Sequence, residues 1–233
     1  MNTRIRRPAL ISVVICSCGL LSASGCQFGQ SRSSPRPGEP ALAQQKFDLV
    51  KEPDINPETR FAAGQLAESR SDWEMAVKQY ESVLKSRPDD TRAMHRLAFC
   101  YTMAGKFDRA ESAWLTYVQA TGRSPDAYNN LAQSYEFAGR PVDAENAYRT
   151  AIERDPRHVY ARTNYGLMLV RTGRIDEGRA QMAHVLPPAE VHYNVASVLQ
   201  LQGNKTQARA EYIKALELDP QLSDARKRLA SLE

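Results

Sequence analysis

Small and large apolar residues return at a constant interval along about three quarters of the chain. Short polar turns recur at spacings of 34, 34, 34 and 30 residues and begin at Ser71, Gly105, Gly139, Gly173 and Gly203. A small residue follows each turn, at Ala76, Ala110, Ala144, Gly178 and Ala208. A larger residue comes four positions later, at Tyr80, Trp114, Tyr148, Met182 and Tyr212. Self-similarity at this period predicts an array of stacked helix–turn–helix units.

The first half of each unit is equally regular. It carries a small residue at Gly64, Ala98, Ala132, Gly166 and Ala196. We expect this residue to let the second helix of the unit approach closely. Pro88, Pro156 and Pro220 close three units, because proline cannot continue a helix. The whole constellation resembles the tetratricopeptide repeat, a 34-residue helix–turn–helix unit. The resemblance implies an all-α fold, a right-handed superhelix of helix pairs with a C-terminal capping helix.

The repeat register predicts a solenoid over residues 57–233. Its expected units are residues 57–90, 91–124, 125–158, 159–188 and 189–222, with a cap at 223–233. The first unit is atypical, because Arg60 and Ala63 stand where larger apolar residues are usual. The fourth unit is four residues short, and Pro187-Pro188 must end its second helix early. We therefore expect eleven helices, no strand, and a local change of superhelix pitch at the fourth unit.

The first 25 residues have the layout of a secretory signal peptide. Arg4, Arg6 and Arg7 precede an apolar stretch at residues 9–21, and small residues follow it. The apolar stretch gives roughly 20 Å of helix, whereas a hydrocarbon core is about 30 Å thick. We therefore expect an exported protein whose mature form has no transmembrane span.

The end of this segment, Ala23-Ser24-Gly25-Cys26, resembles the lipobox of bacterial lipoproteins. The resemblance implies cleavage before Cys26 and a lipid on its thiol. Leucine is usual at the position of Ala23, so cleavage by an ordinary signal peptidase, without lipid, is the alternative. Gln27 follows the cysteine and favours the outer membrane, facing the periplasm. Residues 26–56 are rich in Ser, Pro and Gln and are expected to form a flexible linker.

Charge and candidate chemistry both argue against catalysis and nucleic-acid binding. The net charge of +4 includes Arg4, Arg6 and Arg7, and the chain without them is close to neutral. No basic stripe with interleaved aromatic residues is present, so nucleic acid is not an expected partner. The four histidines are scattered, no nucleotide-binding glycine loop occurs, and Cys100 lies among apolar neighbours. We expect no enzyme activity, no cofactor and no metal site, and a buried Cys100.

The sixth residue of each unit is expected to face the groove of the superhelix. These residues are Ala62, Arg96, Asn130, Asn164, Asn194 and Arg228. The three asparagines are similar to the ladder with which the superhelix of O-GlcNAc transferase binds peptide amides, because an asparagine both donates and accepts. The alternative is that they only bond a neighbouring helix. Aromatic and apolar candidates beside them are Tyr160 and Tyr193, with Tyr128, Phe99, Phe137 and Leu167.

These features predict a protein-binding scaffold in the bacterial envelope. Arg96, the three asparagines, Tyr160 and Tyr193 are its expected groove residues, and the expected partner is an extended peptide or a helix. The layout resembles tetratricopeptide lipoproteins of pilus and secretin assembly. A regulatory subunit of an envelope enzyme is the competing hypothesis, and an exported adaptor without lipid is another.

Overall fold

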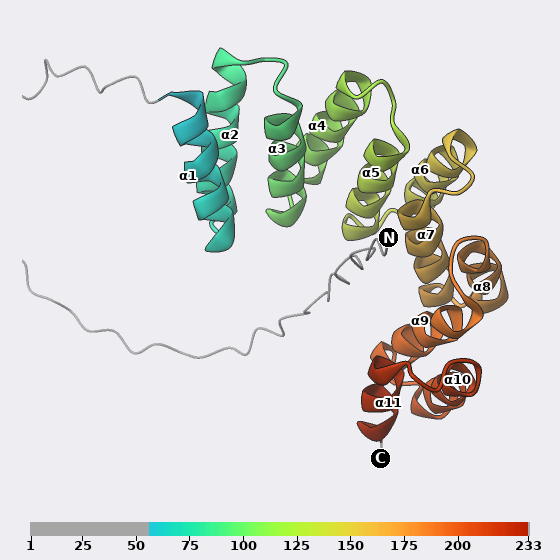
Figure 1. The fold of residues 1–233 in the computed structure, drawn as a ribbon. Helices are drawn as coiled ribbons and strands as arrows, with labels where there is room; N and C mark the ends of the chain where they lie inside the picture. Colours follow the sequence, from blue (N-terminus) through green and yellow to red (C-terminus); the bar gives the residue numbers. More distant parts are fainter. Residues whose placement is uncertain (1–55, 233) are drawn as a thin grey trace, which may run out of the picture. The chain divides into compact units, whose positions relative to one another are not determined.

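The computed structural model describes residues 56–232, and this part of the chain contains eleven helices and no strand. The first helices of the pairs are α1 (Pro57–Ser69), α3 (Thr91–Met103), α5 (Pro125–Phe137), α7 (Val159–Arg171) and α9 (Pro188–Leu201). The second helices are α2 (Trp73–Ser86), α4 (Phe107–Ala120), α6 (Pro141–Arg154), α8 (Ile175–Ala183) and α10 (Lys205–Leu218). The final helix is α11 (Ser223–Ala230). The all-α fold of stacked helix pairs is confirmed (Figure 1).

Each pair turns at a residue with a positive φ angle. Four of these residues are glycines, for example Gly105 at 70° and Gly173 at 86°, and the first pair uses Ser71 at 57°. A side chain is disfavoured in this left-handed region, and glycine avoids that cost. The turn chemistry therefore ends every first helix within about one residue of the same place and starts the second helix at once.

The two helices of a pair cross where both carry a small residue. A Cβ atom added to Gly64 would lie 2.6 Å from the Tyr80 ring, so only glycine leaves room for that ring. Ala98 and Ala132 take the same place in the next two pairs and are fully buried. The ring or apolar side chain that follows fills the space beside the crossing, and Tyr80 is also fully buried. Burial of one such ring stabilises the fold by roughly 2–3 kcal/mol.

The fourth pair departs from the others. Its second helix, α8, has 9 residues where α6 has 14. The crossing of α7 and α8 is made by two glycines, and a Cβ on Gly178 would lie 2.6 Å from the carbonyl oxygen of Gly166. Helix α9 begins at Pro188, one residue before the expected boundary at Ala189, because proline suits the first helical position, where no N–H is needed.

Buried charge fastens the short pair to the pair that follows it. Glu211 of α10 is buried, and it accepts from Arg179 of α8 at 2.7 Å and contacts His192 of α9 at 2.6 Å. In Figure 1 the row of pairs turns gradually from α5 to α11, so the turn is spread over several pairs. The expected change of pitch at the fourth unit remains a prediction.

The described residues contain no helix that is long and apolar enough to cross a membrane. The expected signal peptide, Cys26 and nearly all of the expected linker lie outside the described part of the chain. Cys100 is fully buried, as expected, and burial raises the pKa of its thiol to about 11.

Candidate partner-binding groove

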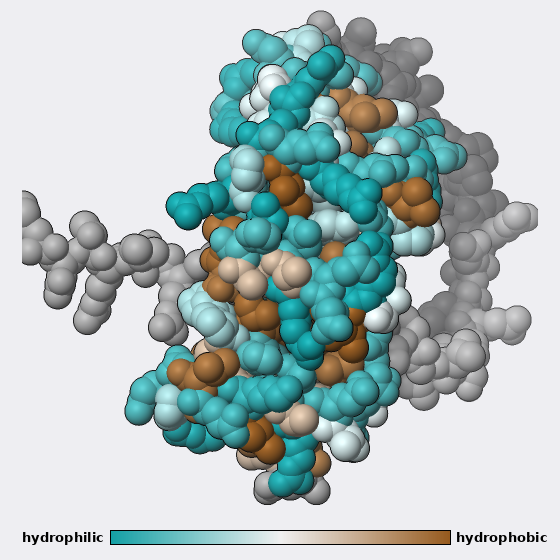
Figure 2. Space-filling model, turned by 90° about the vertical axis from the view of Figure 1, so that its right-hand side faces the viewer, coloured by the Kyte–Doolittle hydropathy of each residue, from teal (hydrophilic) through white to brown (hydrophobic). Residues whose placement is uncertain are grey.

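The first helices line one side of the row of pairs. In Figure 1, α7, α9 and α11 lie on the inner side of its curve, and α8 and α10 lie on the outer side. We call the surface of the first helices that carries Arg96, Asn130, Asn164, Asn194 and Arg228 the inner face. Figure 2 looks at the side that carries α8 and α10 in Figure 1, where apolar side chains lie in small patches among polar ones. The repeat register places the five residues of the inner face at the same position of successive units.

The three expected asparagines of the inner face differ in their contacts. Asn164 donates to the side-chain oxygen of Asn129 at 3.0 Å, and Asn129 donates to Asn130 at 3.4 Å. Two of the asparagines thus belong to one chain of hydrogen bonds that joins α7 to α5. Within residues 56–232, no hydrogen bond involves the side chain of Asn194. The bond of Asn164 to α5 is of the kind that the alternative interpretation expects, a bond to a neighbouring helix, and the sequence analysis did not name Asn129 as the partner.

Arg96 is bound by the preceding pair. Its Nε donates to Glu68 of α1 at 2.8 Å, and a second nitrogen pairs with the other carboxylate oxygen of Glu68. The hydroxyl of Tyr80 donates to the same carboxylate at 2.5 Å, and burial raises the pKa of that hydroxyl. The guanidinium also lies 5.3 Å from the centre of the Phe99 ring. Arg96 therefore links two pairs, and Glu68 is the functional neighbour that sequence reasoning missed.

The two expected aromatic anchors are placed differently. Tyr160 is 51% exposed and lies beside His158, with their rings 6.2 Å apart. Tyr193 is half-buried, and its ring packs 5.8 Å from that of Tyr212. Of the other candidates, Phe137 is exposed, whereas Phe99, Tyr128 and Leu167 are half-buried. Tyr160 and Phe137 are thus the rings that a partner reaches most directly.

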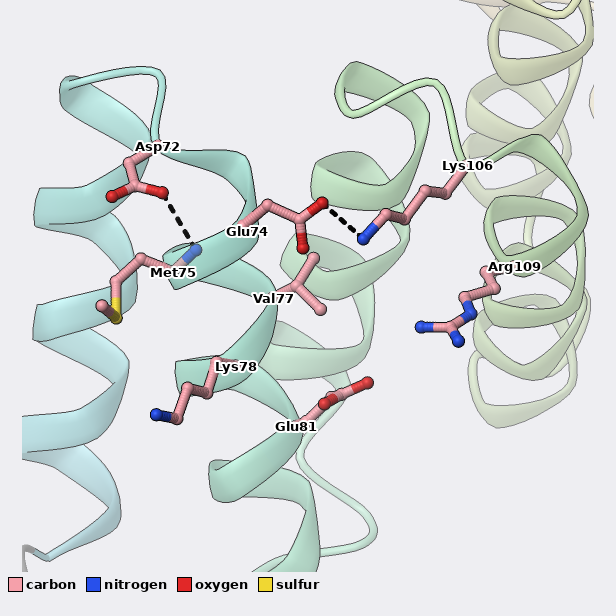
Figure 3. Close-up of a pocket in the computed structure, with 8 residues that line it drawn as sticks. All are labelled: Asp72, Glu74, Met75, Val77, Lys78, Glu81, Lys106 and Arg109. Carbon is pink, nitrogen blue, oxygen red and sulfur yellow. Dashed lines mark hydrogen bonds and ion pairs between the residues drawn. The ribbon is translucent and has the colours of Figure 1, made fainter.

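The outer side carries an open depression of about 390 Å³ between α2 and α4 (Figure 3). Glu74 and Lys106 pair across it at 2.5 Å, and Asp72 accepts from the backbone N–H of Met75 at 3.1 Å. Its other charged residues, Lys78, Glu81 and Arg109, balance the charge to zero. The depression is open and its charges sum to zero, so it has no excess charge that would bind a charged ligand.

Histidines of the described residues contact other side chains and the backbone. No group of three or more His, Cys, Asp or Glu side chains among them could hold a metal ion. His158 contacts Asp126 at 2.9 Å and accepts from the backbone N–H of Ala161 at 3.1 Å, which caps α7. His95 packs against Trp114, and burial lowers its pKa. The contacts of His158 and His95 stabilise the helices and their packing.

The repeated pairs and the lined inner face define a helical-repeat scaffold. A family model described as tetratricopeptide repeat matches residues 61–128 and 129–190, and a second model of that description matches residues 189–222. The chain belongs to the tetratricopeptide repeat family. Members of this family are in general scaffolds that bind other proteins or peptides.

Known proteins of similar sequence or structure match this chain at low sequence identity. Human tetratricopeptide repeat protein 7B is 28% identical over 93 residues, which are 40% of this chain and 11% of that protein. A thermophilic TPR protein of Thermus thermophilus is 24% identical with a TM-score of 0.54, over 76% of this chain and 98% of that one. A chain of the APC/C hetero-tetramer Cut9–Hcn1 is 14% identical with a TM-score of 0.55, over 82% of this chain and 39% of that one.

Proposed function

We propose that this chain is a scaffold of the bacterial cell envelope whose inner face binds an extended peptide or a helix of a partner protein. The observation that carries this proposal is that two side chains of the first helices are available to a partner. Tyr160 is 51% exposed, and Asn194 has both donors and its acceptor available, since no residue of the described part bonds them. An asparagine can bond a peptide unit whatever its side chain, and an exposed ring is a good anchor.

Site-specific photo-crosslinking tests this proposal in living cells. A photoreactive amino acid at Tyr160 of α7 should capture a defined partner, because this side chain is exposed and lies one helical turn before Asn164. The matched control is Leu115 of α4, which is also exposed but lies on a second helix. Capture of the same protein with equal yield from both positions would contradict inner-face binding.

The second part of the proposal is the lipid anchor. The signal-like segment and Ala23-Ser24-Gly25-Cys26 support a lipid on Cys26, and Gln27 supports the outer membrane. After cleavage of the signal, the lipid on Cys26 would be the membrane anchor, and two or three acyl chains are enough for stable anchoring. Cys26→Ala should move the protein to the soluble fraction or leave its signal uncut. A mutant that is still membrane-bound and correctly processed contradicts the anchor.

The narrower proposal is assembly of a pilus or secretin, supported by the likeness in layout to lipoproteins of those systems. The competing proposal, a regulatory subunit of an envelope enzyme, needs the same inner face. Identification of the protein captured from Tyr160 separates the two. A secretin or pilus subunit favours assembly, and an enzyme acting on peptidoglycan favours regulation.

A further inference from the structure

The first and last helix pairs are built on the same aromatic couple. In the first pair, the rings of Phe61 and Tyr80 lie 5.3 Å apart. In the last pair, the rings of Tyr193 and Tyr212 lie 5.8 Å apart. By the repeat register each residue of the last pair has a counterpart in the first, so the charges around the two couples can be compared position by position.

The first pair holds a guanidinium against its half-buried ring. Arg92 lies over Phe61, with the guanidinium carbon 5.1 Å from the ring centre. The same guanidinium pairs with Asp90 at 3.0 Å and lies 3.4 Å from the carboxylate of Glu58, which also pairs with Arg87. An aromatic face next to a carboxylate is a favourable place for a guanidinium, which is planar and weakly hydrated. This arrangement fills the inner face at α1 with the chain's own arginine.

The last pair keeps the carboxylate and the ring but has no arginine there. Glu190 takes the place of Glu58, and Tyr193 takes the place of Phe61. The counterparts of Arg87 and Arg92 are the acids Asp219 and Asp224, and the counterpart of Asp90 is Leu222.

The side-chain hydrogen bonds and ion pairs of Asp219 and Asp224 are with residues two or three positions away in the sequence, and none of them involves Glu190. Asp219 accepts from the backbone N–H of Gln221 at 2.9 Å, and Asp224 lies 3.6 Å from Lys227 on its own helix. Both partners of the Lys227 pair are more than half exposed, so this lysine is loosely held. In residues 56–232, no hydrogen bond or ion pair involves the side chain of Glu190.

We propose that the last pair binds an arginine side chain of the partner between Glu190 and the ring of Tyr193, where the first pair holds Arg92. This inference rests on the proposed function of the inner face and names a feature of the peptide that it takes. Asp219 and Asp224 stand at the counterparts of Arg87 and Arg92, so negative charge replaces positive charge around this place. The chain itself supports this assignment, because a guanidinium occupies the related place in the first pair.

The opposite end of α9 carries the reverse change. In the first pair, Glu68 binds Arg96 and accepts from Tyr80. In the last pair, Gln200 replaces that carboxylate and accepts from Tyr212 at 2.8 Å, and the counterpart of Arg96 is Arg228. Within the described chain, no carboxylate pairs with Arg228.

Glu190 and Gln200 are ten residues apart on α9, which corresponds to about 15 Å. A peptide with its basic residue at Glu190 and an acidic residue toward Arg228 therefore suits both ends.

The test uses a minimal arginine probe, N-acetyl-arginine amide, titrated into the full-length chain held in detergent solution. NMR signals of Glu190 and Tyr193 should shift and saturate at millimolar probe, and the neutral analogue N-acetyl-citrulline amide should bind at least about five-fold more weakly. Glu190→Gln should weaken the arginine probe by about five-fold. The matched control, Glu58→Gln in the first pair, should leave its affinity unchanged, since Glu58 is already occupied.

Asp224→Arg provides a second variant that should keep the fold, because Asp224 is exposed and an arginine there stands at the counterpart of Arg92. It should cover Tyr193 and abolish the shifts. Unchanged probe binding in this variant, equal binding of the citrulline analogue, or no shift at about 20 mM probe overturns the inference. Photo-crosslinking from Tyr160 does not depend on this site, so its loss and the loss of probe binding report on the two proposals separately.

Discussion

The first and last helix pairs share a framework and differ in charge. Both pack an aromatic ring of the first helix against a fully buried tyrosine, Tyr80 in one pair and Tyr212 in the other. In the first pair two arginines pair with Glu58, whereas the counterparts of these arginines in the last pair are the aspartates Asp219 and Asp224. Since both pairs fold alike, the charges are not needed to build the pair. Residues that change between counterparts of a repeat are therefore the best guide to where this scaffold meets other molecules.

Removal of the buried ring is expected to have the largest effect, and an equal one in the two pairs. Tyr80→Ala and Tyr212→Ala should each lower the free energy of unfolding by about 3–5 kcal/mol, because each leaves a cavity in the core. Chemical denaturation followed by circular dichroism measures both. A loss in one pair that is more than about 2 kcal/mol smaller than in the other would show that the two frameworks are not equivalent.

Glu68→Gln makes the first pair resemble the last, where Gln200 stands. It removes the carboxylate that binds Arg96 and Tyr80, so the free energy of unfolding should fall by about 1–3 kcal/mol. The matched control is Gln200→Glu, which gives Arg228 a carboxylate and should be close to neutral. Thermal unfolding measures the stability of both variants. A destabilised Gln200→Glu together with an unchanged Glu68→Gln would contradict the comparison.

Asn164 and Asn194 should respond differently to alanine. Asn164→Ala breaks the bond to Asn129 and should lower stability by about 0.5–1.5 kcal/mol. Asn194→Ala breaks no bond in the described chain, so it should leave stability unchanged and weaken a bound peptide by roughly two- to ten-fold. Melting temperature and affinity for the captured partner are measured on the same samples. If Asn194→Ala lowers stability and leaves affinity intact, this asparagine serves the framework.

Acid should loosen the filled site of the first pair. A hydrogen bond from Arg87 holds the pKa of Glu58 below its ordinary value of 4.5, and Arg92 adds to the effect. The folded pKa lies below the unfolded one, so the ion pairs stabilise the fold above about pH 4.5 and stop doing so as the pH falls through the lowered pKa. NMR titration of the Glu58 carboxyl group follows this step. Glu58→Gln should remove it, and a midpoint above 4.5 would contradict the ion pairs.

The sequence predicted the framework because its rules are local. Gly64 and its counterparts mark the helix crossings, the turn glycines mark the left-handed residues, and Pro187-Pro188 marks the short α8. The inner-face position of Arg96 followed from the same count. Its pairing with Glu68 did not, because that contact depends on how two long side chains meet across neighbouring pairs. The exchange of Arg92 for Asp224 is visible in the repeat register, but what it does to the ring beside it depends on side-chain contacts.

The stoichiometry of the arginine probe tests the central claim most directly. NMR titration of N-acetyl-arginine amide into the full-length chain should shift one cluster of signals, around Glu190 and Tyr193, as expected for one site per chain. Arg87→Asp together with Arg92→Asp gives the first pair acids at the counterparts of Asp219 and Asp224, so the double variant should bind two probes per chain. Asp224→Arg should bind none. The same stoichiometry in all three proteins would contradict the account.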